Sequence, residues 1–312
     1  MIKVKNNTIY IVMYHYVREV KKSKYPNLNA LEFSEFKNQI KYFKKNFDIL
    51  DNDQFYEIIK NKKISKKPSI LLTFDDGYID HYNYVYPYLK KHNISGIFYT
   101  PVKTIQNEIV LDANKIQFIL EKENNKNKVL KLIFYYIKKF FKKDPDKLYL
   151  NKINVKDRYN DKKTMLIKNL LQYHLPKKIR KKVIDLVFKD ILDMEEKEFS
   201  KSLYMNKNHI VEMNKDFMAF GSHGYYHDWL EYLDKKDQEK EILSSINFFK
   251  KLGTFNKSFS VCYPFGSYNK MTLKILKKYN ISFAISGKVG GVVENNLKNN
   301  LTLPRYDTTD FI

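Results

Sequence analysis

The stretch that most constrains the fold of this chain is Leu-Leu-Thr-Phe-Asp-Asp-Gly at residues 71–77. It belongs to an apolar run that begins after Pro68, and this pattern is typical of a strand buried on both faces in a parallel sheet. Asp75 and Asp76 emerge at the carboxyl end of that strand, where α/β proteins usually place their sites. Neighbouring residues there point in different directions, so one carboxylate can bind a metal while the other faces a water molecule. The alternative is that Asp-Asp-Gly is simply a turn made of common turn residues. Candidate site residues elsewhere in the chain must distinguish the two interpretations.

Further short apolar segments bounded by turn residues predict more strands, at residues 8–13, 96–100, 217–220, 259–263 and 281–286. A strand, helix, strand order with a right-handed crossover lays successive strands side by side. On length alone, a single α/β barrel-like domain over residues 1–312 is as plausible as two domains. The segment at about 102–214 differs, because it is rich in lysine and carries apolar stripes at helical spacing. A helical insertion between two barrel strands is the simplest account of it.

Basic residues outnumber acidic ones by 57 to 35, which gives a formal net charge of +22. Such a field favours anionic partners, such as nucleic acid, an acidic glycan or an acidic membrane surface. The lysines are spread along a chain that is also rich in Asn, Ile and Tyr, so a solvated basic surface is the preferred interpretation. No basic stripe is interleaved with aromatic residues as in single-strand binders, and no specific nucleic-acid partner is expected.

Cys262 is the only cysteine, which excludes an intrachain disulfide and a thiolate cluster for zinc. The N-terminal segment has no uninterrupted apolar region followed by a cleavage site, and no apolar span is long enough to cross a membrane. These observations predict a cytoplasmic protein, unless the sequence lacks its leader.

Polar side chains follow four of the predicted strands. They are His15, the pair Asp75 and Asp76, the pair His223 and His227, and the turn at residues 263–266. The carboxyl ends of parallel barrel strands lie on one face, so these residues can meet in space. Two histidines spaced i, i+4 sit one helical turn apart and can share a cation, with a carboxylate as third ligand and a position open for water. The His-x-x-x-His spacing alone arises easily by chance. The pair becomes a more specific signal for a metal site because it follows a predicted strand and a carboxylate pair follows an earlier one.

Residues 73–77, 222–227 and 263–266 resemble the successive motifs of the polysaccharide deacetylases, the NodB-homology or carbohydrate esterase family 4 enzymes. The likeness covers the chain outside the helical insertion. It implies a distorted (β/α) barrel and a metal-dependent hydrolysis of the acetamide on an N-acetylated sugar. It also implies a divalent metal ion as cofactor, with Zn²⁺ as the usual ion. By position, Asp75 resembles the catalytic base, and the metal ligands are matched by Asp76, His223 and His227.

The chain departs from the usual pattern of that family in two places. No histidine follows His227, although the family usually takes its general acid from a late Leu-x-x-His motif. Residues 261 and 262 also lack the arginine that the third motif usually carries. His15, within Tyr-His-Tyr, resembles the early motif of the branch that includes the poly-N-acetylglucosamine deacetylases, where an early histidine takes over the acid role. Arg305, within Leu-Pro-Arg, resembles a late arginine that orients the base.

The chemistry expected from these residues agrees with the resemblance. A divalent cation lowers the pKa of a water molecule and polarises the acetyl carbonyl. Asp75 takes a proton from that water as attack begins. The match to the third motif implies that the backbone N–H of Tyr263 helps to hold the tetrahedral oxyanion. A protonated group must then donate to the leaving amine, and the resemblance implies His15 for this role.

Other conspicuous residues carry weaker signals. His81, His92, His174 and His209 lack a strand-end context, and each is expected to be a surface or hydrogen-bonded structural residue. Trp229, the only tryptophan, follows the second motif closely enough to line a sugar site, and a packing role fits equally well.

The main functional hypothesis is an N-deacetylase whose partner is an N-acetylated carbohydrate, either a glycan or a glycoconjugate precursor. The missing leader favours an intracellular intermediate over mature cell-wall peptidoglycan. A second hypothesis keeps the fold and moves the reaction to the amide of a small non-sugar molecule. A third is a non-catalytic basic module that binds glycan or nucleic acid through its charge, although the intact set of ligands and base argues against it.

Overall fold

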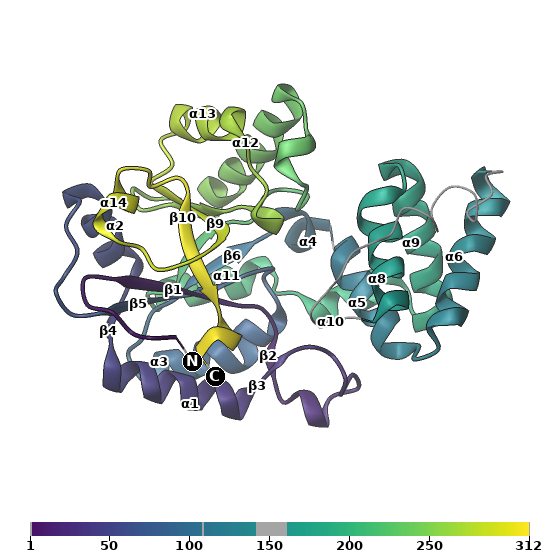
Figure 1. Ribbon diagram of the computed structural model, residues 1–312, viewed down its shortest axis with the longest axis horizontal. Coiled ribbons are helices and arrows are strands. Elements are labelled where there is room, and N and C mark those ends of the chain that lie inside the picture. The colour runs from purple at the N-terminus through teal and green to yellow at the C-terminus, as the bar shows by residue number, and fades with distance from the viewer. Residues whose placement is uncertain (1, 108, 142–160, 312) are drawn as a thin grey trace. The chain divides into compact units, whose positions relative to one another are not determined.

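The computed structural model describes residues 2–107, 109–141 and 161–311 (Figure 1). The chain divides into two compact units, which we call the barrel unit (Met1–Glu19, Ala30–Asn107 and Lys201–Ile312) and the helical unit (Val20–Asn29 and Glu108–Ser200). The predicted insertion at about 102–214 overlaps the helical unit, which begins later and ends earlier. Residues 142–160 of that insertion lie outside the described residues.

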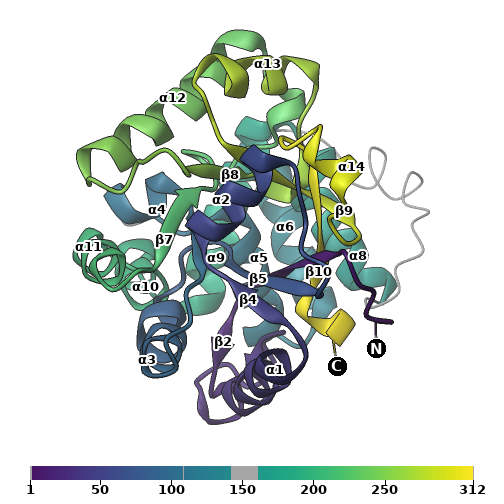
Figure 2. The same ribbon diagram turned by 90° about the vertical axis from the view of Figure 1, so that its left-hand side faces the viewer.

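Parallel strands form the centre of the barrel unit (Figures 1 and 2). In pairing order they are β1 (Ile9–Tyr14), β10 (Leu303–Asp307), β9 (Phe283–Val289), β8 (Ser260–Cys262), β7 (Ala219–Ser222), β6 (Ile97–Thr100) and β5 (Ser69–Phe74). β5 also pairs with β1, from Ser69 opposite Ile9 to Phe74 opposite Tyr14, and this pairing closes the barrel. β4 (Asp48–Leu50) pairs with the first half of β5 and continues the sheet outside the ring. The predicted α/β barrel is therefore confirmed.

Alternate residues of the barrel strands belong to two apolar clusters. On β1, Ile11 belongs to a cluster that includes Leu71 of β5 and Leu303 of β10. Its neighbour Val12 belongs to the cluster that includes Phe36 and other apolar residues of the surrounding helices. Both faces of a strand are thus buried, which explains why the strands read as continuous apolar runs rather than as alternating patterns.

Helices cover the outer surface of the barrel unit, and Figure 2 shows several of them around the strands. Their bounds are α1 (Phe33–Asn46), α2 (Asn52–Asn61), α3 (Tyr86–Lys91), α4 (Val102–Asn107), α11 (Lys207–Lys215), α12 (Lys235–Lys251), α13 (Lys270–Lys278) and α14 (Glu294–Leu297). In α1, Phe36, Ile40 and Phe43 are fully buried, as their helical spacing predicts. A π-helical segment, His81–Val85, precedes α3. A two-stranded sheet of β2 (Val17–Arg18) and β3 (Leu31–Glu32) completes this unit.

The strand β10 escaped prediction from the sequence because Pro304 lies inside it. Proline has no N–H to give to a ladder, and it normally argues against a central strand. Here the register between β10 and β9 shifts between Leu303 and Arg305, so the proline sits at an irregularity. The shift lets β10 join the barrel and carry Arg305 into it.

The helical unit contains α5 (Asp112–Lys122), α6 (Lys126–Phe141), α8 (Lys162–Asn169), a π-helical segment (Leu170–His174), α9 (Lys177–Leu192) and the first residues of α10 (Glu196–Leu203). Of the stripes predicted for this segment, Val129 and Ile133 of α6 and Val183 and Val187 of α9 are buried, whereas Phe140 near the end of α6 is exposed. Lys115 of α5 is also buried, where its ammonium group contacts the carboxylates of Asp185 and Glu196.

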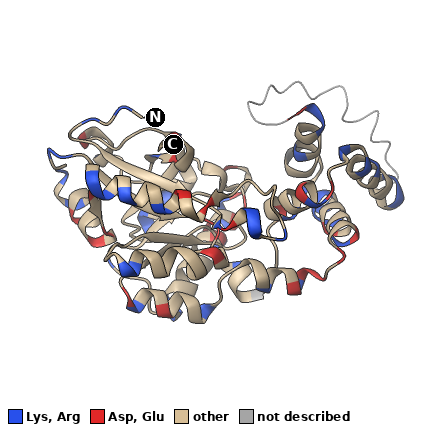
Figure 3. Cartoon of the chain, turned by 90° about the horizontal axis from the view of Figure 1, so that it is seen from below, with Lys and Arg blue, Asp and Glu red and all other residues tan. Residues whose placement is uncertain are grey.

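Lys and Arg lie on helices of both units, with Asp and Glu among them (Figure 3). Within the part of the chain that the structure describes, no helix combines the length and the apolar character that crossing a membrane requires.

Candidate active site

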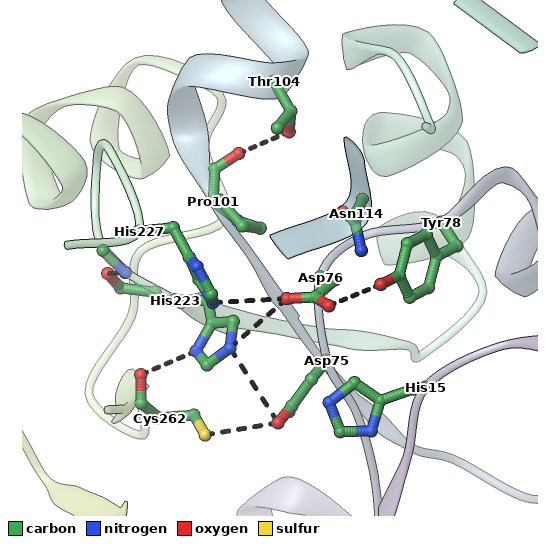
Figure 4. A network of polar contacts seen from close by, with 12 residues as sticks. His15, Asp75, Asp76, Tyr78, Pro101, Thr104, Asn114, His223, His227 and Cys262 are labelled. Atoms are coloured by element: carbon green, nitrogen blue, oxygen red, sulfur yellow. Dashed lines mark hydrogen bonds and ion pairs between the residues drawn. The ribbon is translucent and has the colours of Figure 1, made fainter. Parts of the chain in front are cut away.

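Asp75 and Asp76 follow β5 in a turn that depends on a glycine. Asp76 and Gly77 both have left-handed backbone conformations, with φ of 70° and 68°, which aspartate and glycine tolerate better than most residues. A Cβ atom at Gly77 would lie 2.8 Å from Cγ2 of Thr100 on the neighbouring strand β6. The turn directs Asp76 towards His223 and His227 and Asp75 towards Cys262 (Figure 4).

The side chains of Asp76, His223 and His227 meet at one point above the strand ends (Figure 4). Oδ1 of Asp76 lies 3.5 Å from Nε2 of His223 and 3.4 Å from Nε2 of His227. This oxygen is buried and has no hydrogen-bond partner. Two imidazole nitrogens and a carboxylate oxygen within 4.8 Å of one another are a set that fits a divalent cation. A cation would give the buried oxygen the partner that it lacks.

The ring of His223 is fixed by a second contact. Its Nδ1 lies 2.9 Å from the carbonyl oxygen of Cys262, the last residue of β8. Because a carbonyl oxygen can only accept, Nδ1 carries the proton and donates it. Nε2 therefore presents a lone pair towards Asp76, as a metal-ligating histidine requires.

The segment between the two histidines is a loop, and the expectation that they sit on one helical turn is wrong. Gly224 and His227 adopt left-handed conformations, with φ of 79° and 63°, which a helix excludes. The loop still brings the two rings to a centroid distance of 4.7 Å. The physical reason is that a buried carboxylate organises this loop.

That carboxylate is Glu241, from α12, which is only 3% exposed. Its Oε1 accepts the backbone N–H of Tyr225 at 2.8 Å and that of Tyr226 at 2.6 Å. A Cβ atom at Gly224 would lie 2.9 Å from this oxygen, and the φ of 79° also favours glycine there. Burial raises the pKa of Glu241 to about 7. One sequence signal for this role was missed: Glu241 is an acidic residue on the buried face of an amphipathic helix.

Asp75 lies below this point and pairs with Arg305. Nη2 of Arg305 donates to Oδ2 of Asp75 at 2.6 Å, and the side chains are 7% and 1% exposed. Burial alone would raise the pKa of Asp75, but the adjacent charge of Arg305 outweighs burial and holds that pKa below its usual range. The other oxygen, Oδ1, is buried without a hydrogen-bond partner. Asp75 therefore offers an ionised oxygen with an unused lone pair.

His15 follows β1 and lies beside both carboxylates (Figure 4). Nε2 of His81 hydrogen-bonds to the carbonyl oxygen of His15 at 2.8 Å. His81 is completely buried, and burial lowers its pKa to about 4, so it is a neutral donor to that carbonyl. His81 was expected to be a surface or hydrogen-bonded structural residue. It is hydrogen-bonded, and its partner is the backbone of a candidate site residue.

Tyr78 is a further residue of the site that sequence reasoning missed. Its hydroxyl donates to Oδ2 of Asp76 at 2.6 Å, and its ring stacks on that of Tyr16 at a centroid distance of 3.9 Å. The bond fixes one carboxylate oxygen and leaves Oδ1 directed at the histidines. Its place two residues after Asp76 was the only sequence signal.

Tyr263 does not have the free amide that the sequence-based assignment requires. Its N–H donates to the carbonyl of Ile285 at 3.2 Å, as part of the pairing between β8 and β9. In the fully described turn that follows, Gly266 and Ser267 donate to the carbonyls of Tyr263 and Pro264, and the N–H of Phe265 makes no hydrogen bond. The assignment of the oxyanion donor to Tyr263 is thus corrected, because its amide belongs to the sheet.

The polysaccharide deacetylase family model matches residues 62–143 and 192–284, which together make more than half of the chain. The matched segments contain the turn after β5, the histidine loop and the turn after β8. No curated protein matches the sequence.

Several solved structures share the fold. The Streptococcus pyogenes deacetylase PplD in complex with acetate is 18% identical, with a TM-score of 0.61 over 97% of this chain and 93% of that one. IcaB from Ammonifex degensii is 13% identical, with a TM-score of 0.56 over 97% and 93% of the two chains. The deacetylase domain of BpsB from Bordetella bronchiseptica is 12% identical, with a TM-score of 0.56 over 98% of both chains.

Proposed function

This chain belongs to the polysaccharide deacetylase family, and from that premise we propose a metal-dependent reaction that removes N-acetyl groups from sugar residues of a polysaccharide or glycoconjugate precursor. Family membership makes the chain a carbohydrate N-deacetylase, and the proposal concerns its metal, its catalytic residues and its substrate. The observation that carries the proposal is the buried, partnerless Oδ1 of Asp76 between two imidazole nitrogens.

In this proposal Asp76, His223 and His227 hold a divalent cation through Oδ1 and the two Nε2 atoms. The mixed nitrogen and oxygen donor set suits Zn²⁺ and other first-row divalent ions, and we take Zn²⁺ as the expected ion. When bound, the cation lowers the pKa of a water molecule and polarises an amide carbonyl. Tyr78 and Glu241 hold the ligands in position, the former through Asp76 and the latter through the histidine loop.

Asp75 acts as the general base. Arg305 occupies Oδ2 and keeps the carboxyl group ionised, so Oδ1 can accept the proton of the attacking water. The water oxygen bonds to the acetyl carbon as this proton leaves. The N–H of Phe265, next to His227, donates to the carbonyl oxygen as negative charge develops on it.

His15 acts as the general acid on the other side of the reacting amide. It lies beside both carboxylates, and its backbone is held by His81. The bond between the acetyl carbon and the sugar nitrogen breaks as His15 transfers a proton to that nitrogen, which yields acetate and a free amine.

The net charge of +22 supports a substrate or surface that carries negative charge, such as an anionic glycan or an anionic membrane face. Deacetylation of an anionic acetylated polymer should then weaken as salt rises, whereas deacetylation of a neutral oligomer should not.

The test is acetate release from N-acetylglucosamine oligomers by the purified protein, with and without a chelator, beside Asp75→Asn and His15→Ala. We expect chelator-sensitive release that Zn²⁺ restores, and a loss of about a thousandfold or more in Asp75→Asn. Release from small non-sugar amides but from no acetylated sugar would move the reaction to the second hypothesis. Failure to bind any divalent ion would refute the site itself.

A further inference from the structure

A series of aromatic rings leads from the proposed metal ligands to the surface of the barrel unit. The ring centroids of His227 and Phe265 are 4.6 Å apart, those of Phe265 and Trp229 4.3 Å, and those of Trp229 and Tyr232 6.1 Å. Phe265 and Trp229 are parallel to within 4°. The side of the site next to His227 is therefore continuous with an aromatic surface, which we call the ring series and define as Phe265, Trp229 and Tyr232.

The ring series is accessible to a ligand. Phe265 is 41% exposed and Tyr232 is 75% exposed, and Trp229 is partly exposed. Stacked aromatic pairs that serve packing in this chain differ, since Phe74 and Phe98 stack at 4.7 Å and are both completely buried. Exposed, contiguous apolar side chains beside a site commonly mark a binding surface.

Hydrogen bonds fix the ring series in place without a ligand. The N–H of Glu231 donates to Oγ of Ser267 at 3.0 Å, and Nδ2 of Asn269 donates to the carbonyl of Glu231 at 3.3 Å. Leu230, between the two exposed rings, is 1% exposed and anchors the segment in the core. These contacts tie Leu230–Tyr232 to the turn that carries Phe265, so a ligand meets a surface that needs little ordering.

The chemistry of these rings suits a pyranose sugar. One face of such a sugar presents C–H groups that pack on an aromatic ring, while its hydroxyl groups lie around the edge. Phe265 stacks on one face of Trp229, which leaves the opposite face of Trp229 for a sugar. Tyr232 adds a ring and a hydroxyl group that can hydrogen-bond at the exposed end of the series.

We propose that Phe265, Trp229 and Tyr232 form a subsite for the sugar residue next to the one that is deacetylated. The inference rests on the proposed function and deepens it, because it makes an oligosaccharide or polysaccharide the substrate rather than a single sugar or a small amide. The acetylated residue lies at the metal ligands, and the chain continues over Trp229 towards Tyr232.

The first test is the dependence of kcat/KM on the length of an N-acetylglucosamine oligomer, from the single sugar to the hexamer. We expect kcat/KM to rise with length in the wild type. Tyr232→Ala should lower the value for the hexamer about three- to tenfold, and Trp229→Ala about tenfold or more. Tyr232→Phe keeps the ring and should retain most of the gain. Tyr232 is so exposed that its replacement leaves the fold intact, which protects the test from a misfolded Trp229→Ala.

Phe217 provides a matched control. It is 87% exposed and lies just before β7, at the opposite end of the strand from His223. Phe217→Ala removes a similarly exposed ring from the same unit and should leave the length dependence unchanged. Equal kcat/KM for the single sugar and the hexamer in the wild type would overturn the subsite while leaving deacetylation in place.

The second test measures binding without turnover. Trp229 is the only tryptophan, so its fluorescence reports directly on the ring series. Asp75→Asn loaded with Zn²⁺ should change its emission when the hexamer is added and much less with the single sugar, and Tyr232→Ala should weaken the hexamer response. If no acetylated sugar is deacetylated but the hexamer still gives this change, the proposed function fails and the subsite stands. No change with the hexamer refutes the subsite in either case.

Discussion

Two clusters of buried charge, one in each unit, differ in how completely their atoms are paired. In the barrel unit, Arg305 pairs with one oxygen of Asp75. Four further atoms are buried without a hydrogen-bond partner, namely Oδ1 of Asp75, Oδ1 of Asp76, and Nε and Nη1 of Arg305. In the helical unit, the ammonium group of Lys115 contacts both Asp185 and Glu196. Oε1 of Glu196 also accepts the N–H of Val110 at 2.9 Å. Within the described residues, none of the side-chain atoms of this second cluster is buried without a partner.

The difference separates a cluster built for chemistry from one built for stability. Buried polar atoms are normally satisfied, because each unsatisfied one costs about 1–3 kcal/mol. The Lys115 cluster follows this rule, and its carboxylates are also more than a third exposed. The Asp75–Arg305 cluster breaks it, and the atoms without a hydrogen-bond partner include the two oxygens to which we assign metal binding and proton transfer. Buried charged side chains with atoms that lack a hydrogen-bond partner therefore identify the site better than the presence of buried charge alone.

The largest expected effect comes from Arg305→Gln, which removes the cation beside Asp75. Burial would then dominate and raise the pKa of Asp75, so the base would take up its proton at a higher pH than in the wild type. The acidic limb of the pH profile of kcat/KM should move to higher pH, and kcat/KM near neutrality should fall about a hundredfold. Arg18→Gln, which breaks the 2.7 Å pair of Arg18 and Asp80, serves as control and should leave that limb in place. An unshifted limb in Arg305→Gln would contradict the role of Arg305.

Glu241→Ala should weaken metal binding by about 10- to 100-fold, as loss of a group that supports metal ligands typically does. The histidine loop would lose the acceptor of two backbone N–H groups. Glu241→Gln retains an acceptor oxygen and should lie between the wild type and Glu241→Ala. Zn²⁺ titration against a competing chelator measures the affinity. Glu239→Ala on the same helix removes a surface contact to Lys278 and Tyr279, and it should match the wild type. Equal affinities in all three variants would contradict a positioning role.

Tyr78→Phe should weaken metal binding about tenfold, because Oδ2 of Asp76 loses its donor while the ring remains to stack on Tyr16. The same titration detects the change. Tyr82→Phe, which removes a hydroxyl bound to Glu212 at the surface, is the matched control. An unaffected Tyr78→Phe would mean that the carboxylate of Asp76 needs no support from Tyr78.

The smallest effect on activity is expected for Lys115→Met in the helical unit. It should lower the free energy of unfolding by about 2 kcal/mol, less than for a fully buried pair, because the carboxylates left behind can be hydrated. Activity per folded molecule should not change. Thermal unfolding measures the loss, and Lys189→Met, which breaks an exposed pair with Glu195, should cost clearly less stability than Lys115→Met. A loss of metal binding in Lys115→Met would contradict the conclusion that the Lys115 cluster serves stability alone.

The sequence was sufficient to predict which strand ends share one face. Each of five candidate residues follows a short apolar segment, and parallel strands align their carboxyl ends. These residues are His15, Asp75, Asp76, His223 and His227. The strand that carries Arg305 could not be predicted, because Pro304 conceals it and only the register shift against β9 accommodates that residue.

The supporting residues were out of reach for a different reason. Glu241 and His81 act on backbone groups, of Tyr225 and Tyr226 in one case and of His15 in the other. The pattern of side chains in a sequence does not show which backbone N–H or carbonyl groups lack a hydrogen-bond partner once the sheet has formed. The same limitation misdirected the assignment of Tyr263, whose N–H is used by the ladder to β9.

The pairing of β1 with β10, in which Val12 lies opposite Tyr306, has a consequence for the order of assembly. During synthesis the Asp75 turn and the histidine loop emerge long before residue 305, and contacts so distant in sequence form late. Until β10 docks, Asp75 lacks the cation that keeps it ionised. Asp75 is therefore held ionised only after β10 has paired with its neighbours and the barrel has closed. A nascent or clipped chain that ends before β10 would have the metal ligands but no ionised base.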